Sequence, residues 1–149
     1  MRTSAVRPLL RLPDKGAVFG IRGGEWVAVA KDGLLATIEE APHAFLALLE
    51  IPQDAADALV RAAALEENLA PESLPPFPHP DVVVAGLRSP SAYWQELAFA
   101  RVGRQPSAEP WLEELRRLAV NGATQAIRHE ARRLSRGHGF VPPAGQDAT

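Results

Sequence analysis

Residues 17–38 read AVFGIRGGEWVAVAKDGLLATI, and this stretch decides the fold. Its apolar runs are interrupted by Gly23-Gly24 and by Asp32-Gly33, two pairs that tolerate the positive φ angles of two-residue hairpin turns. Just upstream, residues 9–12 form a further apolar run, and residues 13–16 (PDKG) are typical of a type I turn closed by a glycine. The pattern therefore predicts an N-terminal antiparallel β-meander of three or four strands.

Two-residue turns also fix the register of the strands. The expected pairs are Ile21 with Trp26, Phe19 with Ala28 and Ala30 with Leu35. One face then carries Phe19, Ile21, Trp26 and Leu35, and the other carries Val18, Val27, Val29, Leu34 and Ile38. Both faces are apolar, whereas an antiparallel sheet with one face in water alternates more cleanly. Either helices cover both faces, or one apolar face is kept for a partner protein or for a homo-oligomer.

Two packing helices are expected after the sheet, over residues 42–49 and 54–68. Acidic residues at the start of the second helix suit the helix dipole. Its buried side is expected to contain Ala55, Leu59, Ala62, Ala63, Leu65 and Leu69.

Residues 71–80 (PESLPPFPHP) contain five prolines in ten positions. Proline lacks a backbone N–H and has a fixed φ, so this stretch argues against helix and central strand and favours an extended polyproline conformation. We interpret it as a linker that forms a stiff strap across the protein's own surface. The alternative is a docking ligand for an aromatic groove of another protein.

The remaining sequence is predominantly helical in pattern. Residues 81–87 are ambiguous, because three consecutive valines favour a strand while Pro80 and an acidic start suit the short helix that we prefer. Further helices are expected over residues 91–102, 107–120 and 124–136, the first of them capped by Ser89 or Ser91. Asn121-Gly122 is expected to end the second of these, because both residues tolerate the left-handed conformation.

These elements predict an α+β fold in which a β-meander precedes a C-terminal helical subdomain. The expected parts are residues 1–70 (meander and packing helices), 71–80 (proline-rich linker), 81–137 (helical subdomain) and 138–149 (flexible tail). At 149 residues, we expect them to form one compact unit.

Charge and composition narrow the functional classes. The net charge of −2 disfavours a dedicated binder of nucleic acid or of an anionic membrane, although residues 1–75 carry net −4 and residues 76–149 net +2. There is no cysteine, which excludes disulfides, thiolate metal sites and a cysteine nucleophile. No apolar run approaches the ~20 residues of a membrane span, and we expect a cytoplasmic protein.

Sequence motifs for catalysis are missing. The four histidines lack metal-ligand spacing, and no Gly-x-Ser-x-Gly elbow is present. The glycine run at residues 20–24 lacks the Lys-Ser/Thr of a phosphate-binding loop. We therefore expect no catalytic residues, no metal and no cofactor.

An arginine ridge is the strongest functional feature of the sequence. Arg128, Arg132 and Arg136 recur every four residues on the last predicted helix and are flanked by Arg133. The opposite, buried side of that helix is expected to contain Ala123, Ala126, Ile127, Ala131 and Leu134. The ridge has three possible counterparts, namely this chain's own carboxylates such as Glu113, Glu114 or Glu130, an acidic protein partner, or phosphate.

The phosphate alternative has a specific form. The last two predicted helices and the turn between them resemble a helix-turn-helix, in which Thr124, Gln125 and Arg128 begin a recognition helix. A DNA-binding regulator is therefore one functional alternative, although DNA binders usually show a strong basic excess.

A second resemblance covers residues 89–98 (SPSAYWQELA) and 125–134 (QAIRHEARRL). These segments look like the helical ends of short uncharacterised bacterial proteins, some of which are similar to immunity proteins of polymorphic toxin systems. The resemblance implies a protein that binds one toxin and blocks it, without catalytic residues. The meander has no counterpart in it.

The sequence thus predicts a non-catalytic protein-binding module, most concretely an immunity-type inhibitor that occludes a toxin by stoichiometric binding. The expected contact residues, chosen because aromatic residues and arginines dominate binding hot spots, are Trp26, Val27, Arg128, Arg132, Arg133 and Arg136.

Overall fold

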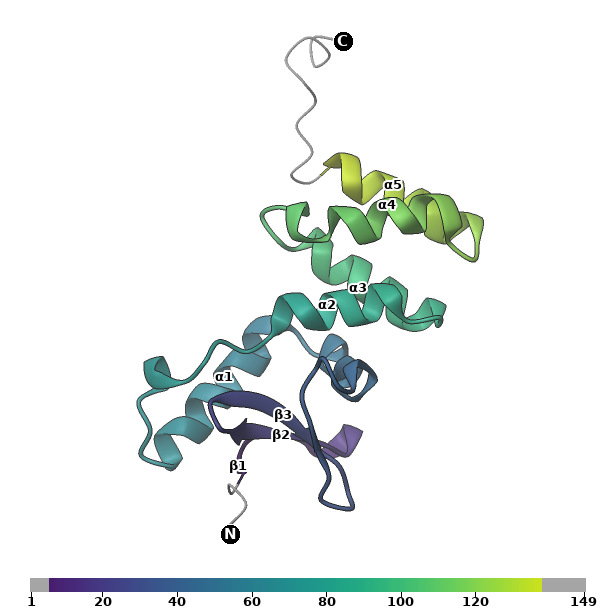
Figure 1. The fold of residues 1–149 in the computed structure, drawn as a ribbon. Helices are drawn as coiled ribbons and strands as arrows, with labels where there is room; N and C mark the ends of the chain where they lie inside the picture. Colours follow the sequence, from purple (N-terminus) through teal and green to yellow (C-terminus); the bar gives the residue numbers. More distant parts are fainter. Residues whose placement is uncertain (1–5, 138–149) are drawn as a thin grey trace. The chain divides into compact units, whose positions relative to one another are not determined.

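The computed structural model describes residues 6–137, in which a sheet precedes a series of helices (Figure 1). This arrangement confirms the predicted α+β class. The chain divides into two compact units, with the boundary between Val82 and Val83. The proline-rich segment thus belongs to the first unit, and the predicted tail at residues 138–149 lies outside the described residues.

The first unit contains a four-stranded antiparallel sheet of order β1-β2-β3-β4. Its strands are β1 (Arg7–Leu12), β2 (Ala17–Arg22), β3 (Glu25–Val29) and β4 (Leu35–Ala36). The β2–β3 hairpin has the predicted register, with Ile21 opposite Trp26 and Phe19 opposite Ala28. Gly23 and Gly24 have φ angles of 62° and 81°, as a tight two-residue turn between right-twisted strands requires.

The predicted register of the β3–β4 hairpin is wrong by one residue, because Leu35 pairs with Val29 and not with Ala30. The loop has three residues: the Gly33 N–H donates to the Ala30 carbonyl (2.9 Å), and the Ala30 N–H donates to the Leu34 carbonyl (2.8 Å). Gly33, with a φ of 89°, adds the extra position as a glycine bulge. A one-residue slip reverses the faces, so Leu35 joins the Val29 face and Leu34 is 69% exposed.

The helices of the first unit include a 3₁₀ segment, η2 (Pro42–Glu50), and α1 (Gln53–Glu66). α1 packs against β1, but its buried residues are Ala56 and Ala64, so the predicted buried side is wrong. Leu59 and Leu65 are 47% and 61% exposed. Alanines occur on all sides of this helix, and the apolar pattern therefore does not specify which side packs.

The proline-rich segment is only partly extended. Pro71 begins a short 3₁₀ turn, η3 (Pro71–Ser73), and Pro80 lies in the first turn of α2 (His79–Arg88), where a missing N–H is tolerated. The expectation that the whole segment avoids helix is therefore wrong, whereas the helix preferred for residues 81–87 is confirmed.

Between those two helical turns the segment forms the predicted strap across the first unit. Phe77 packs edge-on against Trp26 at a ring-centroid distance of 4.8 Å and against Phe19 at 6.1 Å. The indole Nε1 of Trp26 donates a hydrogen bond to the Pro75 carbonyl (2.9 Å). The rings of Phe19 and Phe45, 5.0 Å apart, extend this aromatic cluster into the core.

The second unit is helical. It comprises the end of α2, then α3 (Ala92–Gly103), the 3₁₀ turn η4 (Glu109–Trp111), α4 (Leu112–Asn121) and α5 (Gln125–Gly137). Ser91 occupies the cap position of α3 as predicted, but its side chain makes no capping hydrogen bond. Within the described residues, no helix has both the length and the apolar character that crossing a membrane demands.

Gly122 ends α4 for a different reason from the one predicted. Its φ is −57°, which is not left-handed, and Asn121 is still part of the helix. A Cβ atom on Gly122 would lie 2.6 Å from the Leu118 carbonyl oxygen and 2.8 Å from Cγ2 of Ile127. The glycine is therefore needed because α4 and α5 approach each other closely at their connection.

The side of α5 that packs in the second unit is narrower than predicted. Ile127, Ala131 and Leu134 are buried as expected. Ala123, which precedes the helix, and Ala126 are exposed, contrary to the prediction. Ile127 is therefore the first buried residue of α5.

Candidate functional site

Trp26 and Val27, predicted as partner contacts, are core residues of the first unit. Trp26 is 6% exposed and Val27 is fully buried. The strap covers the indole, and the Pro75 carbonyl accepts its N–H. The apolar character of these residues is thus accounted for within the chain.

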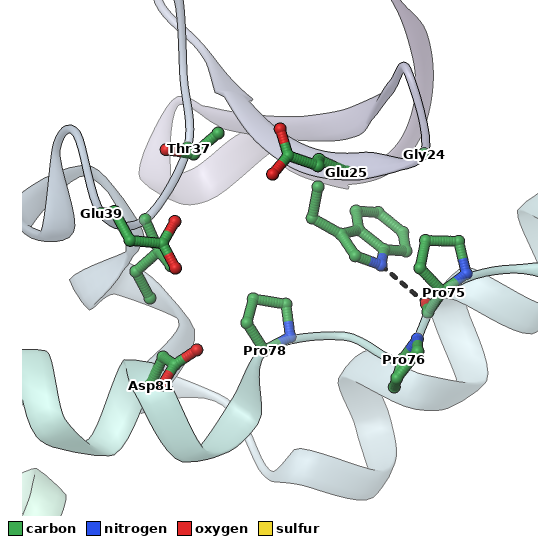
Figure 2. A pocket seen from close by; sticks show the side chains of 10 residues that line it. Gly24, Glu25, Thr37, Glu39, Pro75, Pro76, Pro78 and Asp81 are labelled. Carbon is green, nitrogen blue, oxygen red and sulfur yellow. Dashed lines mark hydrogen bonds between the residues drawn. The ribbon is translucent and has the colours of Figure 1, made fainter.

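Trp26 instead contributes to the wall of a pocket of about 170 Å³ in the first unit (Figure 2). Pro75, Pro76 and Pro78 from the strap line the same pocket. Three carboxylates also line it, and Figure 2 shows Glu25, Glu39 and Asp81 around one shared space. We refer to it below as the acidic pocket.

Each carboxylate comes from a different part of the fold. Glu25 is the first residue of β3, directly after the two-glycine turn. Glu39 lies in a turn fixed by reciprocal hydrogen bonds, in which the Thr37 N–H donates to Oε1 of Glu40 (2.9 Å) and the Glu40 N–H donates to Oγ1 of Thr37 (3.3 Å). Asp81 lies in the first turn of α2, where the helix dipole favours a negative charge.

The start of α2 is anchored to α1, and this anchor places Asp81. Nε2 of His79 lies 2.7 Å from Oδ1 of Asp57 on α1. The imidazole ring also packs on Phe77 at a centroid distance of 5.1 Å. The strap and the first turn of α2 are thereby held to the rest of the first unit.

The acidic pocket combines negative charge with an apolar wall. Within residues 6–137, no ion pair involves Glu25, Glu39 or Asp81. Across the same residues, no three His, Asp or Glu side chains converge as metal ligands. An indole face and proline rings suit the aliphatic stem of a lysine or arginine, and carboxylates suit its charged end.

The arginine ridge of α5 is divided between internal contacts and solvent. Arg133 forms a bidentate pair with Glu130, with Nε–Oε1 and Nη2–Oε2 distances of 3.0 and 2.5 Å. This hydrogen bonding lowers the pKa of Glu130 despite its partial burial. Nη1 of Arg128 donates to the Gly122 carbonyl (2.7 Å). Arg132 and Arg136 are exposed and form no ion pair with any residue that the structure describes.

Of the carboxylates predicted to neutralise the ridge, only Glu130 does so. Glu114 instead binds Arg88 at the end of α2 and Arg117 on its own helix. Glu113 is exposed and makes no ion pair with the described residues.

The three residues proposed for DNA contact all have partners inside the second unit. Oγ1 of Thr124 accepts the Ile127 N–H (3.1 Å) and so caps α5, while Nε2 of Gln125 lies 3.3 Å from Nε2 of His129. Arg128 is held by the Gly122 carbonyl.

Sequence reasoning missed the acidic pocket. Glu25, Glu39 and Asp81 are far apart in the sequence and share no motif spacing. Glu39 follows the sheet in an acidic pair with Glu40, and the fold alone brings Glu39 beside the strap. No local signal would have identified these residues together.

The chain matches no protein-family model, and comparison with curated proteins and with solved structures gives no significant match.

Proposed function

We propose that this chain is a non-catalytic protein-binding module, and most concretely an immunity-type inhibitor that occludes a toxin by one-to-one binding. The acidic pocket is the observation that carries the proposal. It offers three carboxylates without intramolecular ion pairs in the described residues, beside a rigid wall of indole and proline. The partner would insert a lysine or arginine side chain from its surface.

The rigidity of the pocket supports a binding role. Trp26 is fixed by its bond to Pro75, and the turn bearing Glu39 is fixed by the Thr37–Glu40 hydrogen bonds. Side chains that are already ordered lose little conformational entropy when a partner binds. A basic side chain placed among these carboxylates would also speed association by electrostatic attraction.

The arginines of α5 support a second, weaker part of the contact. Arg132 and Arg136 are exposed and form no ion pair within residues 6–137, so their guanidinium groups are available to acidic residues of a partner. Arg133 is less available because Glu130 holds it.

Co-expression with the reading frames that flank the gene tests this function. A flanking product that arrests growth should be neutralised by the wild-type chain, and the two purified proteins should form a one-to-one complex. The double variant Glu39→Gln/Asp81→Asn should bind at least about tenfold more weakly, because it leaves the partner's cation without its counter-charges.

A matched control is Glu66→Gln/Glu72→Gln, which removes two exposed carboxylates of the same unit outside the pocket. This control should bind like the wild type. The proposal fails if no flanking product binds the chain, or if the control and the pocket variant bind equally well.

A further inference from the structure

The two units carry opposite net charges. The described part of the first unit, residues 6–82, has six basic and twelve acidic side chains, which is a net charge of −6. The described part of the second unit, residues 83–137, has nine arginines, no lysine and five glutamates, which is a net charge of +4. The small net charge of the whole chain therefore conceals a basic helical unit.

The arginine ridge concentrates this charge on one side of α5, which carries four of the nine arginines. Arg132 and Arg136 are exposed and lie about one helical turn apart, and Gln125 and His129 continue the same exposed side. Arg128 is half-buried and donates one hydrogen bond to a backbone carbonyl, which leaves most of its N–H donors for a ligand. No apolar side chain belongs to this side of α5.

Carboxylates do not neutralise the arginine ridge. Glu130 is the only carboxylate of α5, and Arg133 already pairs with it. It lies on the flank of the helix that faces α3, where it lines a groove together with Glu96 and Ala126. The neighbouring helix α4 has one exposed carboxylate and two exposed arginines, namely Glu113, Arg116 and Arg117. The field along the ridge is therefore positive.

Phosphate suits this surface better than the carboxylates of a protein partner. The cores of protein–protein interfaces are apolar and depleted of charge, whereas interfaces with nucleic acid are more polar and much more positive. A nucleic acid also presents a regular row of charges of one sign, about 3.4 Å apart along each strand of a duplex. Arg128, Arg132 and Arg136 form a matching row of cations, about 6 Å apart along the helix axis. The guanidinium fork matches phosphate geometry.

We infer that the arginine ridge binds the phosphate backbone of nucleic acid without reading its sequence. At about 0.1 M salt, charges beyond about 10 Å are largely screened, so the local charge of α5 outweighs the net charge of the whole chain. Phosphate contacts position a protein on nucleic acid but carry no sequence information. This inference goes beyond the proposed function, because it assigns a second ligand class and does not involve the acidic pocket.

Fluorescence anisotropy of the full-length chain with a labelled DNA duplex of mixed sequence, about 20 bp long, tests the inference. We expect micromolar binding at low salt. If three arginines each displace one counterion from the duplex, the affinity falls about 40-fold between about 50 and 200 mM salt. A chain that does not bind at low salt, or an affinity that salt leaves unchanged, overturns the inference.

Variants of the ridge locate the contact. Arg132→Gln/Arg136→Gln should weaken binding at low salt at least about tenfold and reduce the salt effect to about threefold, because only one phosphate contact remains. Arg132→Lys/Arg136→Lys keeps both charges and should retain most of the binding and of its salt dependence. Circular dichroism confirms that each variant is folded. Retained binding in the glutamine variant contradicts the role of the ridge.

A matched control removes the same charge from the other unit. Arg11 and Arg61 are exposed and make no ion pair with the described residues, so Arg11→Gln/Arg61→Gln should bind DNA like the wild type. If this control loses as much affinity as the glutamine variant of the ridge, binding follows net charge and the inference fails.

Polyglutamate represents the alternative ligand, an acidic protein surface. It should compete with the duplex at least about tenfold more weakly, because its lower charge density releases fewer counterions. Equal competition would assign the ridge to acidic proteins and overturn the inference. Neutralisation through the acidic pocket is read out separately, by co-expression without DNA. Failure of nucleic-acid binding and failure of the proposed function are therefore distinguishable.

Discussion

Glu114 shows how one buried charge organises the second unit. It is 9% exposed, accepts a hydrogen bond from Nε of Arg88 (2.7 Å), and accepts another from Nη2 of Arg117 (3.0 Å). Arg117 also donates to the Leu87 carbonyl (3.3 Å). Burial alone would raise the pKa of Glu114, but the two guanidinium groups outweigh it and hold the pKa below its usual value.

We predict that Glu114→Gln lowers the free energy of unfolding by about 1–2 kcal/mol at neutral pH, because it weakens the charge-assisted hydrogen bonds from Arg88 and Arg117. Since the folded-state pKa is lowered, this stabilisation is fully present above the unfolded-state pKa of about 4.3 and is lost as the pH falls through the folded-state value. Urea unfolding at a series of pH values checks both statements.

Glu113→Gln is the control, because this neighbour is exposed and unpaired within the described residues. It should leave the unfolding curve almost unchanged. Equal effects of the two substitutions, or a gap between wild type and Glu114→Gln that does not narrow in acid, would contradict the role assigned to Glu114.

Single residues were the hardest features to predict from the sequence. Glu113 and Glu114 are adjacent and chemically identical, yet only Glu114 faces Arg88. Trp26 was predicted as a partner contact, but the sequence did not show that the strap would cover it. In both cases the deciding contact comes from a residue at least 26 positions away.

At the level of elements, we predict that Gly122→Ala destabilises the α4–α5 pair by about 1–3 kcal/mol. The added Cβ would overlap the Leu118 carbonyl oxygen and Ile127, and neither is the free end of a flexible chain. Gly103→Ala in α3 is the opposite case, because its Cβ would meet only Cδ2 of Leu134 at 3.8 Å.

Gly103→Ala should therefore stabilise the protein, by about 0.5 kcal/mol or more, through higher helix propensity. Thermal denaturation shows directly whether each of the two substitutions raises or lowers the melting temperature. If Gly122→Ala does not lower the melting temperature, close helix approach is not the reason for the glycine at position 122.

Elements with strong local signals were predicted well, and those that depend on packing were not. Gly23-Gly24 fixed the β2–β3 register, because two positive φ angles leave only one short turn. Asp32-Gly33 is compatible with both a two-residue and a three-residue loop, so the β3–β4 register stayed ambiguous and was assigned one residue off. The burial of α1 depends on β1, which the helix sequence does not specify.

At the level of the whole molecule, the chain divides into two compact units and we predict that they respond separately to mutation. Trp26→Phe removes the hydrogen bond to Pro75 and should lower hydrogen-exchange protection in residues 6–82. Glu114→Gln should lower protection in residues 83–137. Exchange measured by mass spectrometry locates each effect.

Loss of protection across both units in either variant would mean that the chain unfolds as one cooperative unit, contrary to this prediction. Helix α2 contains residues of both units and so joins them in one continuous helix. The test is informative because this connection could transmit unfolding from one unit to the other.

The sequence by itself determined the α+β class, the order of the elements, the β2–β3 hairpin and the existence of a proline strap. These features depend on local physics: backbone angles allowed to glycine and proline, and the periodicity of apolar residues. Only the tertiary structure decided that Trp26 is buried, that Glu25, Glu39 and Asp81 line one pocket, and which arginines of α5 stay exposed. Those outcomes depend on contacts between distant segments, and no local pattern encodes which distant residue will be the neighbour.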